Sequence, residues 1–241
     1  MERTSELEPK EIDTPESAIL ADLLKQRRSC RAFRPEAVSE AIIGRVLELA
    51  QFSASWCNAQ PWQLIITKGK ATEDLRKALL ADIQDNPQAQ SDLVFPERYS
   101  GVFLERKRTV GWQLYNQLGV ERGDREGSRR AAMENFHLFG APHVAILTTE
   151  RELGIYGAVD CGFYAAHFQI AAQSLGVATI AQAALAQRAP LLRRHFDIPV
   201  ERQILLAISF GYANDAHPAN QFGSTRADLP EVVKWVSGNQ G

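Results

Sequence analysis

The sequence has few cysteines, and none of them is placed for structural cross-linking. Cys30, Cys57 and Cys161 are odd in number and widely separated, and no Cys-x-x-Cys motif occurs. This pattern excludes a disulfide-stapled scaffold and argues against a tetrahedral zinc site. It is typical of proteins from a reducing compartment, so we predict a cytoplasmic location.

Long apolar runs are also missing. No stretch reaches the roughly 18 consecutive apolar residues that a membrane-spanning helix needs. Residues 1–15 are acidic and polar, without the apolar core of a signal peptide. The formal net charge is only −2, so nothing favours binding to nucleic acid or to an anionic membrane. The sequence therefore predicts neither of these partners.

The common nucleotide-binding and hydrolytic motifs are absent as well. The chain contains no Gly-x-Gly-x-x-Gly after a strand, no Gly-x-x-x-x-Gly-Lys-Ser/Thr and no Gly-x-Ser-x-Gly. These absences exclude a Rossmann fingerprint, an ordinary P-loop and a nucleophile elbow. The five histidines lack a metal-ligand spacing such as His-Glu-x-x-His, and we predict no metal site.

What remains is an ordinary globular composition, with 241 residues of which 45% are hydrophobic and 23% charged. We predict a flexible arm over residues 1–15 and a single domain over residues 16–241. Helical spacing of apolar residues predicts helices from residue 16 to the basic cluster at 27, from a Ser39 cap to 50, and from a Thr72 cap to about 85. Further helices are expected over 131–139, 157–175 and 190–196, with Gly176 as a stop and a short amphipathic piece at 232–236.

Strands are expected over residues 62–67, 143–149 and 203–210, where bulky apolar residues are concentrated. Residues 86–130 are less regular and highly charged, as on a solvated surface. Few strands among many helices, one of them long and buried, favour an α+β layer structure.

A basic cluster follows the first predicted helix. Arg27, Ser29 and Arg31 occupy alternate positions, with Arg28 between them. Two guanidiniums and a hydroxyl at this spacing can point at one phosphate, whose oxygens match the arginine fork. The alternative is a basic helix end that is favoured by the helix dipole and binds no ligand.

A second candidate segment is the loop ahead of the first predicted strand, Ser-Ala-Ser-Trp-Cys-Asn-Ala-Gln-Pro-Trp at 53–62. Its amides and backbone N–H groups could bind the edge of a heteroaromatic ring, with Trp56 lining an apolar site. The alternative is a turn with a hydrophobic plug. Cys57 within it is either a redox-sensitive thiol or a buried inert one, and we favour the buried form.

Together the two segments resemble the start of the FMN-dependent nitroreductases, in which Arg-Arg-Ser-x-Arg precedes Ser-x-x-Asn-x-Gln-Pro-Trp. The resemblance continues through 156–162, 171–176, the loop at 179–185, and 210–213 with 218–220 and 225–226, and covers about residues 20–232. Residues 110–142 further resemble the branch that includes 4-nitrobenzoate reductases. The resemblance implies a nitroreductase-type α+β fold, with a central mixed or antiparallel sheet flanked by helices, in an intertwined homodimer with two FMN sites at the interface.

The resemblance also implies roles for particular residues. Arg27, Ser29, Arg31 and Arg226 would hold the FMN phosphate and ribityl chain, and Arg28 would contribute its side chain or only its backbone. Ser55, Trp56, Asn58 and Gln60 would border the isoalloxazine, largely from the partner subunit. Asn135 would reach the polar edge of the ring, and Gln182, Ala183 and Ala184 would lie near N5. No protein residue is predicted to be catalytic, because flavin N5 carries the chemistry.

The implied activity is ping-pong transfer of hydride from NADPH or NADH through bound FMN to nitroaromatic or quinone-type acceptors. Residues 86–130 would shape the acceptor pocket. Alternatives are another flavin reaction on the same fold, such as dehalogenation, flavin cleavage or dehydrogenation, and a non-catalytic flavin-binding protein. A plain helical interaction domain would bind no flavin at all.

Overall fold

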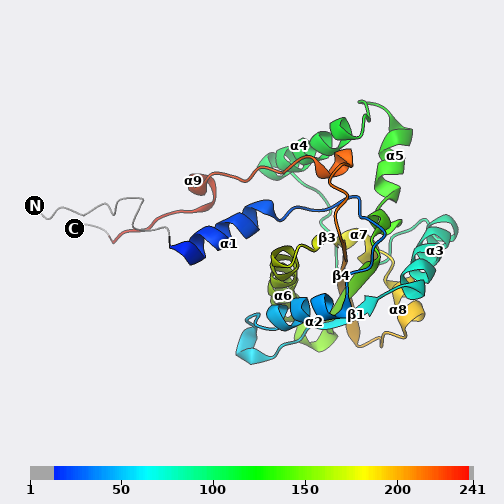
Figure 1. The fold of residues 1–241 in the computed structure, drawn as a ribbon, viewed down its shortest axis with the longest axis horizontal. Coiled ribbons are helices and arrows are strands. Elements are labelled where there is room, and N and C mark those ends of the chain that lie inside the picture. The colour runs from blue at the N-terminus through cyan, green and yellow to red at the C-terminus, as the bar shows by residue number, and fades with distance from the viewer. Residues whose placement is uncertain (1–13, 239–241) are drawn as a thin grey trace, which may run out of the picture.

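A four-stranded antiparallel sheet forms the centre of the computed structural model, which describes residues 14–238. Its strands are β1 (Gln63–Thr67), β2 (His143–Glu150), β4 (Arg202–Gly211) and β3 (Ala178–Gln182), in the spatial order β1-β2-β4-β3. The three predicted strands are confirmed to within one residue at each end, and the predicted α+β class is confirmed (Figure 1).

The strand β3 is a correction, because the sequence analysis assigned residues 179–185 to a loop. Thr179 pairs with Phe210 and Ala181 with Ile208 of β4. Small residues dominate this strand, so it lacks the bulky apolar signal of its neighbours. It is an edge strand, and its outer side receives the chain at Ser29 in a parallel bridge to Thr179.

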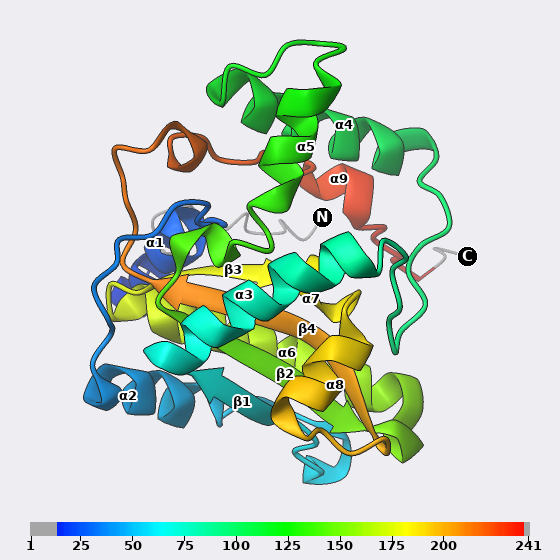
Figure 2. The same ribbon diagram turned by 90° about the vertical axis from the view of Figure 1, so that its right-hand side faces the viewer.

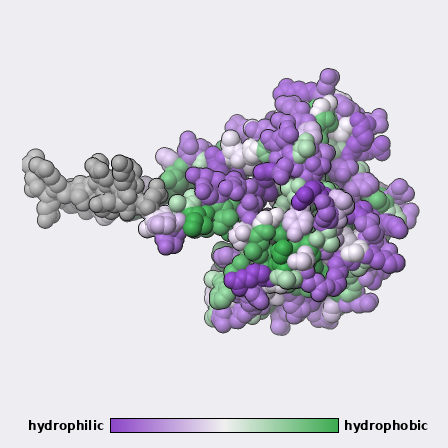
Figure 3. Space-filling view, in the orientation of Figure 1, coloured by the Kyte–Doolittle hydropathy of each residue, from purple (hydrophilic) through white to green (hydrophobic). Residues whose placement is uncertain are grey.

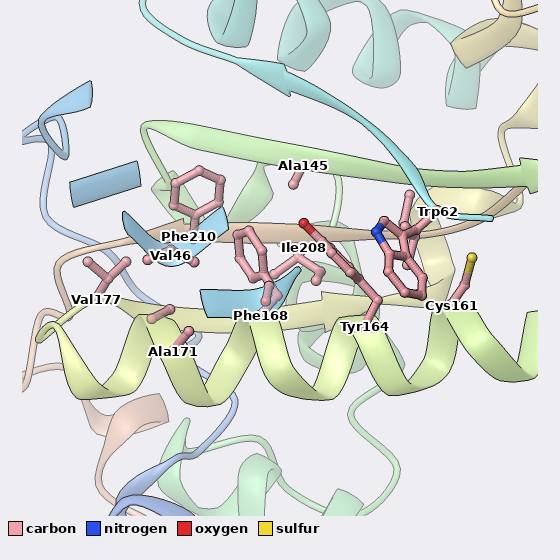
Figure 4. Packing of buried hydrophobic residues seen from close by; sticks show 14 of the residues in the cluster. Val46, Trp62, Ala145, Cys161, Tyr164, Phe168, Ala171, Val177, Ile208 and Phe210 are labelled. Atoms are coloured by element: carbon pink, nitrogen blue, oxygen red, sulfur yellow. The ribbon is translucent and has the colours of Figure 1, made fainter. Parts of the chain in front are cut away.

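The two faces of the sheet bury different helices, as strand alternation requires. Ala145 and Leu147 pack with the helices α2 (Glu40–Ala50) and α6 (Gly154–Ser174). Trp62 stacks on Tyr164 of α6 with ring centroids 5.0 Å apart, within the apolar cluster drawn in Figure 4. On the opposite face, β2 packs against α3 (Lys70–Asp85) and α8 (Ala189–Phe196), as Figure 2 shows.

Local sequence explains several of the helix boundaries. Ser39 caps α2 as predicted, accepting a hydrogen bond from the N–H of Ile42 across 3.3 Å. Gly176 stops α6 as predicted, with a φ of +72° that an L side chain rarely adopts. Thr72 is not the cap of α3, however, because Gly69 occupies that position. The buried Thr72 hydroxyl instead donates to the carbonyl of Pro142 across 2.9 Å.

The segment between α3 and β2 differs from expectation. Residues 86–130 contain the helix α4 (Gly101–Gln117) and the start of α5 (Arg125–Met133), which replaces the helix predicted over 131–139. Asp124 caps α5 by accepting from the N–H of Gly127 across 2.8 Å. The chain then leaves the α-helix through a short 3-10 turn, Leu138–Gly140, where Phe139 has a φ of +54°. Both helices extend away from the sheet (Figures 1 and 2).

The helix α1 (Pro15–Gln26) and the C-terminal segment project from the same side of the domain (Figure 1). The helix α9 covers Leu229–Val232, and the chain is extended at Val233, within the short amphipathic piece predicted at 232–236. The predicted arm at 1–15 falls outside the described residues except for Thr14 and Pro15, which begin α1. The remaining short elements are α7 (Ala183–Ala186) and 3-10 turns at Trp56–Asn58, Arg151–Leu153 and Pro218–Asn220. Within residues 14–238 no helix has the length and apolar character needed to cross a bilayer.

Candidate functional site

The predicted basic cluster lies where α1 ends. The chain becomes extended at Arg27, with φ −62° and ψ 116°, and then runs along the edge of β3. The N–H of Cys30 donates to the carbonyl of Thr179 across 3.0 Å, which fixes the segment to the sheet. Arg27, Ser29 and Arg31 therefore line one cavity of about 610 Å³.

This cavity is rich in positive charge. Its lining residues are Leu24, Lys25, Arg27, Arg28, Ser29, Arg31, Val110, Phe222, Gly223, Ser224 and Arg226. Arg28 forms an ion pair with Asp215 at 2.8 Å. No carboxylate among residues 14–238 forms an ion pair with Arg27, Arg31 or Arg226. Among the described residues the lining contains no acidic side chain, so the cavity suits an anion.

The positive groups in this cavity are partly withdrawn from water. Burial lowers the pKa of the Arg27 guanidinium, and the neighbouring charge of Arg226 lowers it further. Burial likewise lowers the pKa of Arg31. Because guanidiniums remain charged in proteins, the lowered pKa values indicate positive charge that is partly removed from water rather than deprotonation. A phosphate monoester, with a charge of about −1.5 to −2, would compensate it.

The C-terminal segment completes the cavity through a residue to which the sequence analysis assigned no role. Asn220 is buried, accepts from the N–H of Arg31 across 2.7 Å, and donates to the carbonyl of Ala32 across 2.8 Å. This bridge brings Phe222 beneath the Arg31 guanidinium, 5.7 Å from the ring centroid, and Arg226 to the rim. Asn220 belongs to the Pro-Ala-Asn motif at 218–220, which contributes to the family resemblance but does not predict the contacts of Asn220 with Arg31 and Ala32.

A second group of predicted residues lies further along β3. Gln182 is 2% exposed, donates from Nε2 to the carbonyl of Asn135 across 2.9 Å, and accepts from Ser209 across 2.5 Å. Its side chain is therefore occupied within the protein. Ala183 and Ala184 follow at the start of α7, with Ala183 exposed. At about 3.3 Å per strand residue, Gln182 lies about 10 Å along β3 from Thr179, the residue that pairs with Ser29 of the basic cluster.

The predicted ring-binding loop lies elsewhere in the chain. Ser55, Trp56, Asn58 and Gln60 are joined by the 3-10 turn Trp56–Asn58, and none of them lines the basic cavity. The backbone N–H of Trp56 bonds to Asp160, in the N-terminal half of α6. From Asp160, α6 continues for about 21 Å at 1.5 Å per residue to its end at Ser174, and the chain then enters β3, whose Thr179 pairs with Ser29 of the basic cluster. One chain alone does not unite the two groups.

Two further predictions can be compared with the structure. Cys57 is exposed, so the preference for a buried thiol is wrong. The backbone at Cys57 has a φ of +50°, and the residue type alone does not predict this conformation. Within the part of the chain that the structure describes, no cluster of three His, Cys, Asp or Glu residues could hold a metal ion.

With this geometry established, comparison with known proteins identifies the class. The profile of the Nitroreductase family matches residues 24–212. The chain therefore belongs to the nitroreductase family, and the resemblance stated from the motifs is confirmed.

Individual relatives place the chain more finely within that family. It is 34% identical over 216 residues to nitroreductase NfnB of Mycolicibacterium smegmatis, an alignment that covers 88% of this chain and 91% of that protein. It is 27% identical over 213 residues to a 4-nitrobenzoate reductase of Pseudomonas putida, covering 87% and 93%. The crystal structure of FMN-dependent NfnB from Mycobacterium smegmatis in complex with NADPH superposes with a TM-score of 0.87 at 33% identity, covering 92% of this chain and all of that one. The predicted nitroreductase fold is thereby confirmed.

Proposed function

We propose that this protein is an FMN-dependent oxidoreductase that uses NADPH or NADH to reduce nitroaromatic or quinone-type acceptors. The observation that carries the proposal is the cavity with Arg27, Arg31 and Arg226, three guanidiniums that form no ion pair with a carboxylate within residues 14–238. The relatives support the same activity, because they are nitroreductases and NfnB is FMN-dependent with an NADPH complex.

The residues present fit the phosphate end of FMN. Arg27, Arg31 and Arg226 would neutralise the phosphate, while the Ser29 hydroxyl would donate to it or to the ribityl chain. Arg28 would act mainly through its backbone, because Asp215 holds its side chain. FMN bound here would supply the redox chemistry, accepting hydride from the nicotinamide and delivering electrons to the acceptor.

The protein groups near the end of β3 would orient the ring. Gln182 holds Asn135 in place through two contacts from its amide nitrogen, at 2.9 Å to the carbonyl and 3.4 Å to the side chain. The Asn135 amide would then face the polar edge of the ring, and the backbone of Ala183 and Ala184 would face its N5 side. This arrangement requires no protein acid or base for the reductive half of the reaction.

The ring-binding loop would be contributed by a second copy of the chain. The exposed side of α6 carries an apolar stripe of Ile155, Tyr156, Val159 and Phe163, which are 82%, 59%, 44% and 50% exposed. Figure 3 shows apolar side chains gathered over α6, with a further apolar group along α1. Burying both surfaces in a homodimer would remove a large apolar area from water. The exposed side chains of the C-terminal segment, Leu229, Val232, Trp235 and Val236, suit an arm that wraps the partner.

The test is the visible spectrum of the purified protein before and after anaerobic addition of NADPH or NADH. Flavin bands that bleach, and recover on addition of nitrobenzoate or menadione, would support the full proposal. Bands that do not bleach would indicate a flavin-binding protein without the reductive reaction. A colourless protein that takes up no added FMN would contradict the proposal.

The three cysteines are free thiols, which supports a location in the reducing cytoplasm.

A further inference from the structure

The loop over residues 55–60 has an unusual backbone. Cys57, Asn58 and Gln60 have φ values of +50°, +55° and +49°, although none of them is glycine. Three side-chain-bearing residues in the left-handed region within four positions make the conformation costly. Such a conformation persists only where the surrounding contacts impose it.

The first of these contacts is made by a buried carboxylate, that of Asp160. Asp160 on α6 is 5% exposed and accepts the backbone N–H of Trp56 at both carboxylate oxygens, at 3.2 and 3.1 Å. Within residues 14–238 it forms no ion pair and accepts no other side-chain or loop hydrogen bond. Burying a carboxylate with one donor is unfavourable for stability alone, so its presence needs another explanation.

The second contact is a chain of amides on the other side of the loop. Gln51 accepts from the indole N–H of Trp62 across 3.0 Å and donates to Gln60 Oε1 across 3.0 Å. Gln60 in turn donates from its side chain to the carbonyl of Asn58 across 3.3 Å, and its backbone N–H donates to Ser55 Oγ across 3.0 Å. The loop is thus held between a buried carboxylate and a residue at the end of α2.

We propose that Asp160 and Gln51 are positioning residues, which hold the loop 55–60 in the strained form that presents its amides to the flavin of the partner subunit. The inference rests on the proposed function, in which this loop borders the flavin ring. Neither residue reaches the flavin; each acts through the loop backbone or Gln60. Asp160 binds the first N–H of the 3-10 turn, and Gln51 holds the last polar side chain of the loop.

The experiment compares FMN affinity of full-length apoprotein variants with their stability. Asp160→Ala removes both acceptor oxygens, whereas Asp160→Asn keeps one carbonyl oxygen for the Trp56 N–H. The matched control is Cys161→Ala, the next residue on α6, which is fully buried in the core and lies near the carbonyl of Thr148 rather than the loop. Affinity is measured by quenching of FMN fluorescence, and the melting temperature of each apoprotein is recorded alongside.

We expect Asp160→Ala to weaken FMN binding by about tenfold or more, since it frees the loop at a buried hydrogen bond. Asp160→Asn should stay within about threefold of the parent protein, and Gln51→Ala should weaken binding by a few-fold. Cys161→Ala should lower the melting temperature without changing FMN affinity. In the apoprotein, cleavage by chymotrypsin after Trp56 should be faster for Asp160→Ala than for Cys161→Ala.

Two results would overturn the inference: Asp160→Ala binding FMN as tightly as Cys161→Ala, or Asp160→Asn binding as weakly as Asp160→Ala. If Asp160→Ala does not fold, the decision passes to Gln51→Ala, whose exposed side chain is not needed for the core. Unchanged FMN affinity there would equally refute the inference. If the parent chain itself fails to bind FMN, the proposed function is refuted instead.

Discussion

The imidazole of His143 accepts a hydrogen bond from the backbone N–H of Val38 across 3.0 Å, while its other ring nitrogen lies 3.1 Å from the carbonyl oxygen of Thr67. These contacts assign a neutral ring, with the proton on Nδ1 and Nε2 as acceptor. The ring also stacks on Phe210 with centroids 5.1 Å apart. The buried side chain of His143, at the start of β2, thus contacts both the segment ahead of α2 and the last residue of β1.

The burial of His143 makes the stability of the fold depend on pH. Burial lowers the pKa of His143 from its ordinary 6.5, so the folded state favours the neutral ring. This contribution is fully present above pH 6.5 and is lost as the pH falls from there through the lowered folded-state pKa, because the unfolded chain then binds more protons. The free energy of unfolding, from urea titrations between about pH 7.5 and 5, should fall more steeply for the parent than for His143→Gln. Equal slopes would remove His143 as the cause.

Arg27 should distinguish FMN from riboflavin. Arg27→Met removes a half-buried guanidinium, and a charge-assisted hydrogen bond contributes about 1.5–3 kcal/mol, or about a 10- to 100-fold change in affinity. FMN affinity should fall by that amount, while the affinity for riboflavin, which lacks the phosphate, should change little. Arg45→Met is the control, because Arg45 pairs with Glu48 on the surface of α2. Equal losses for both ligands would contradict a phosphate role.

Phe163 tests the proposed interface. Its ring is 50% exposed on the apolar stripe of α6, and an aspartate there would place a charge within the buried dimer surface. Phe163→Asp should sediment as a monomer and lose FMN, because the partner no longer supplies its loop. Val94→Asp, at a 94% exposed site outside the stripe, should sediment like the parent. A Phe163→Asp variant that behaves as the parent does would move the interface elsewhere.

Gly157 on α6 should reject a side chain that Gly44 on α2 accepts. A Cβ at Gly157 would lie 2.8 Å from Leu153 Cβ and 2.9 Å from Thr149 Oγ1, whereas one at Gly44 meets nothing within 4 Å. Gly157→Ala should therefore cost about 1–3 kcal/mol by overpacking. Gly44→Ala should gain about 0.5–1 kcal/mol from helix propensity. The measurement is the melting temperature of each variant. A Gly157→Ala variant more stable than the parent would show that Leu153 and Thr149 move aside to accept the new methyl group.

The sequence predicted those parts of the site that depend on neighbouring positions. Arg27, Ser29 and Arg31 converge because an extended chain turns alternate residues to one side, which is a local property. In contrast, the separation between these three residues and the loop at 55–60 depends on the length of α6. This is a property of the tertiary fold, which neighbouring positions in the sequence do not reveal. Only the family resemblance connected the two segments before the structure was known.

The errors arise where tertiary contacts override local preference. Thr72 has the side chain of a cap, yet it lies buried in the first turn of α3, where its hydroxyl reaches the carbonyl of Pro142. The strand β3 forms from small residues because β4 supplies its hydrogen-bond partners. Asp160 was visible in the sequence as part of a motif, but nothing local linked it to Trp56, 104 residues away.

The bond from Asn220 to Ala32 spans 188 residues of sequence. A chain emerging from the ribosome exposes Arg27 and Arg31 well before Asn220 and Arg226, so the cavity cannot close until residue 226 has been synthesised. The core formed by α2, α6 and the four strands can assemble before then. Cofactor loading therefore has to wait for residues 220–226, and a chain truncated before Asn220 would present Arg27 and Arg31 without the segment that fixes them.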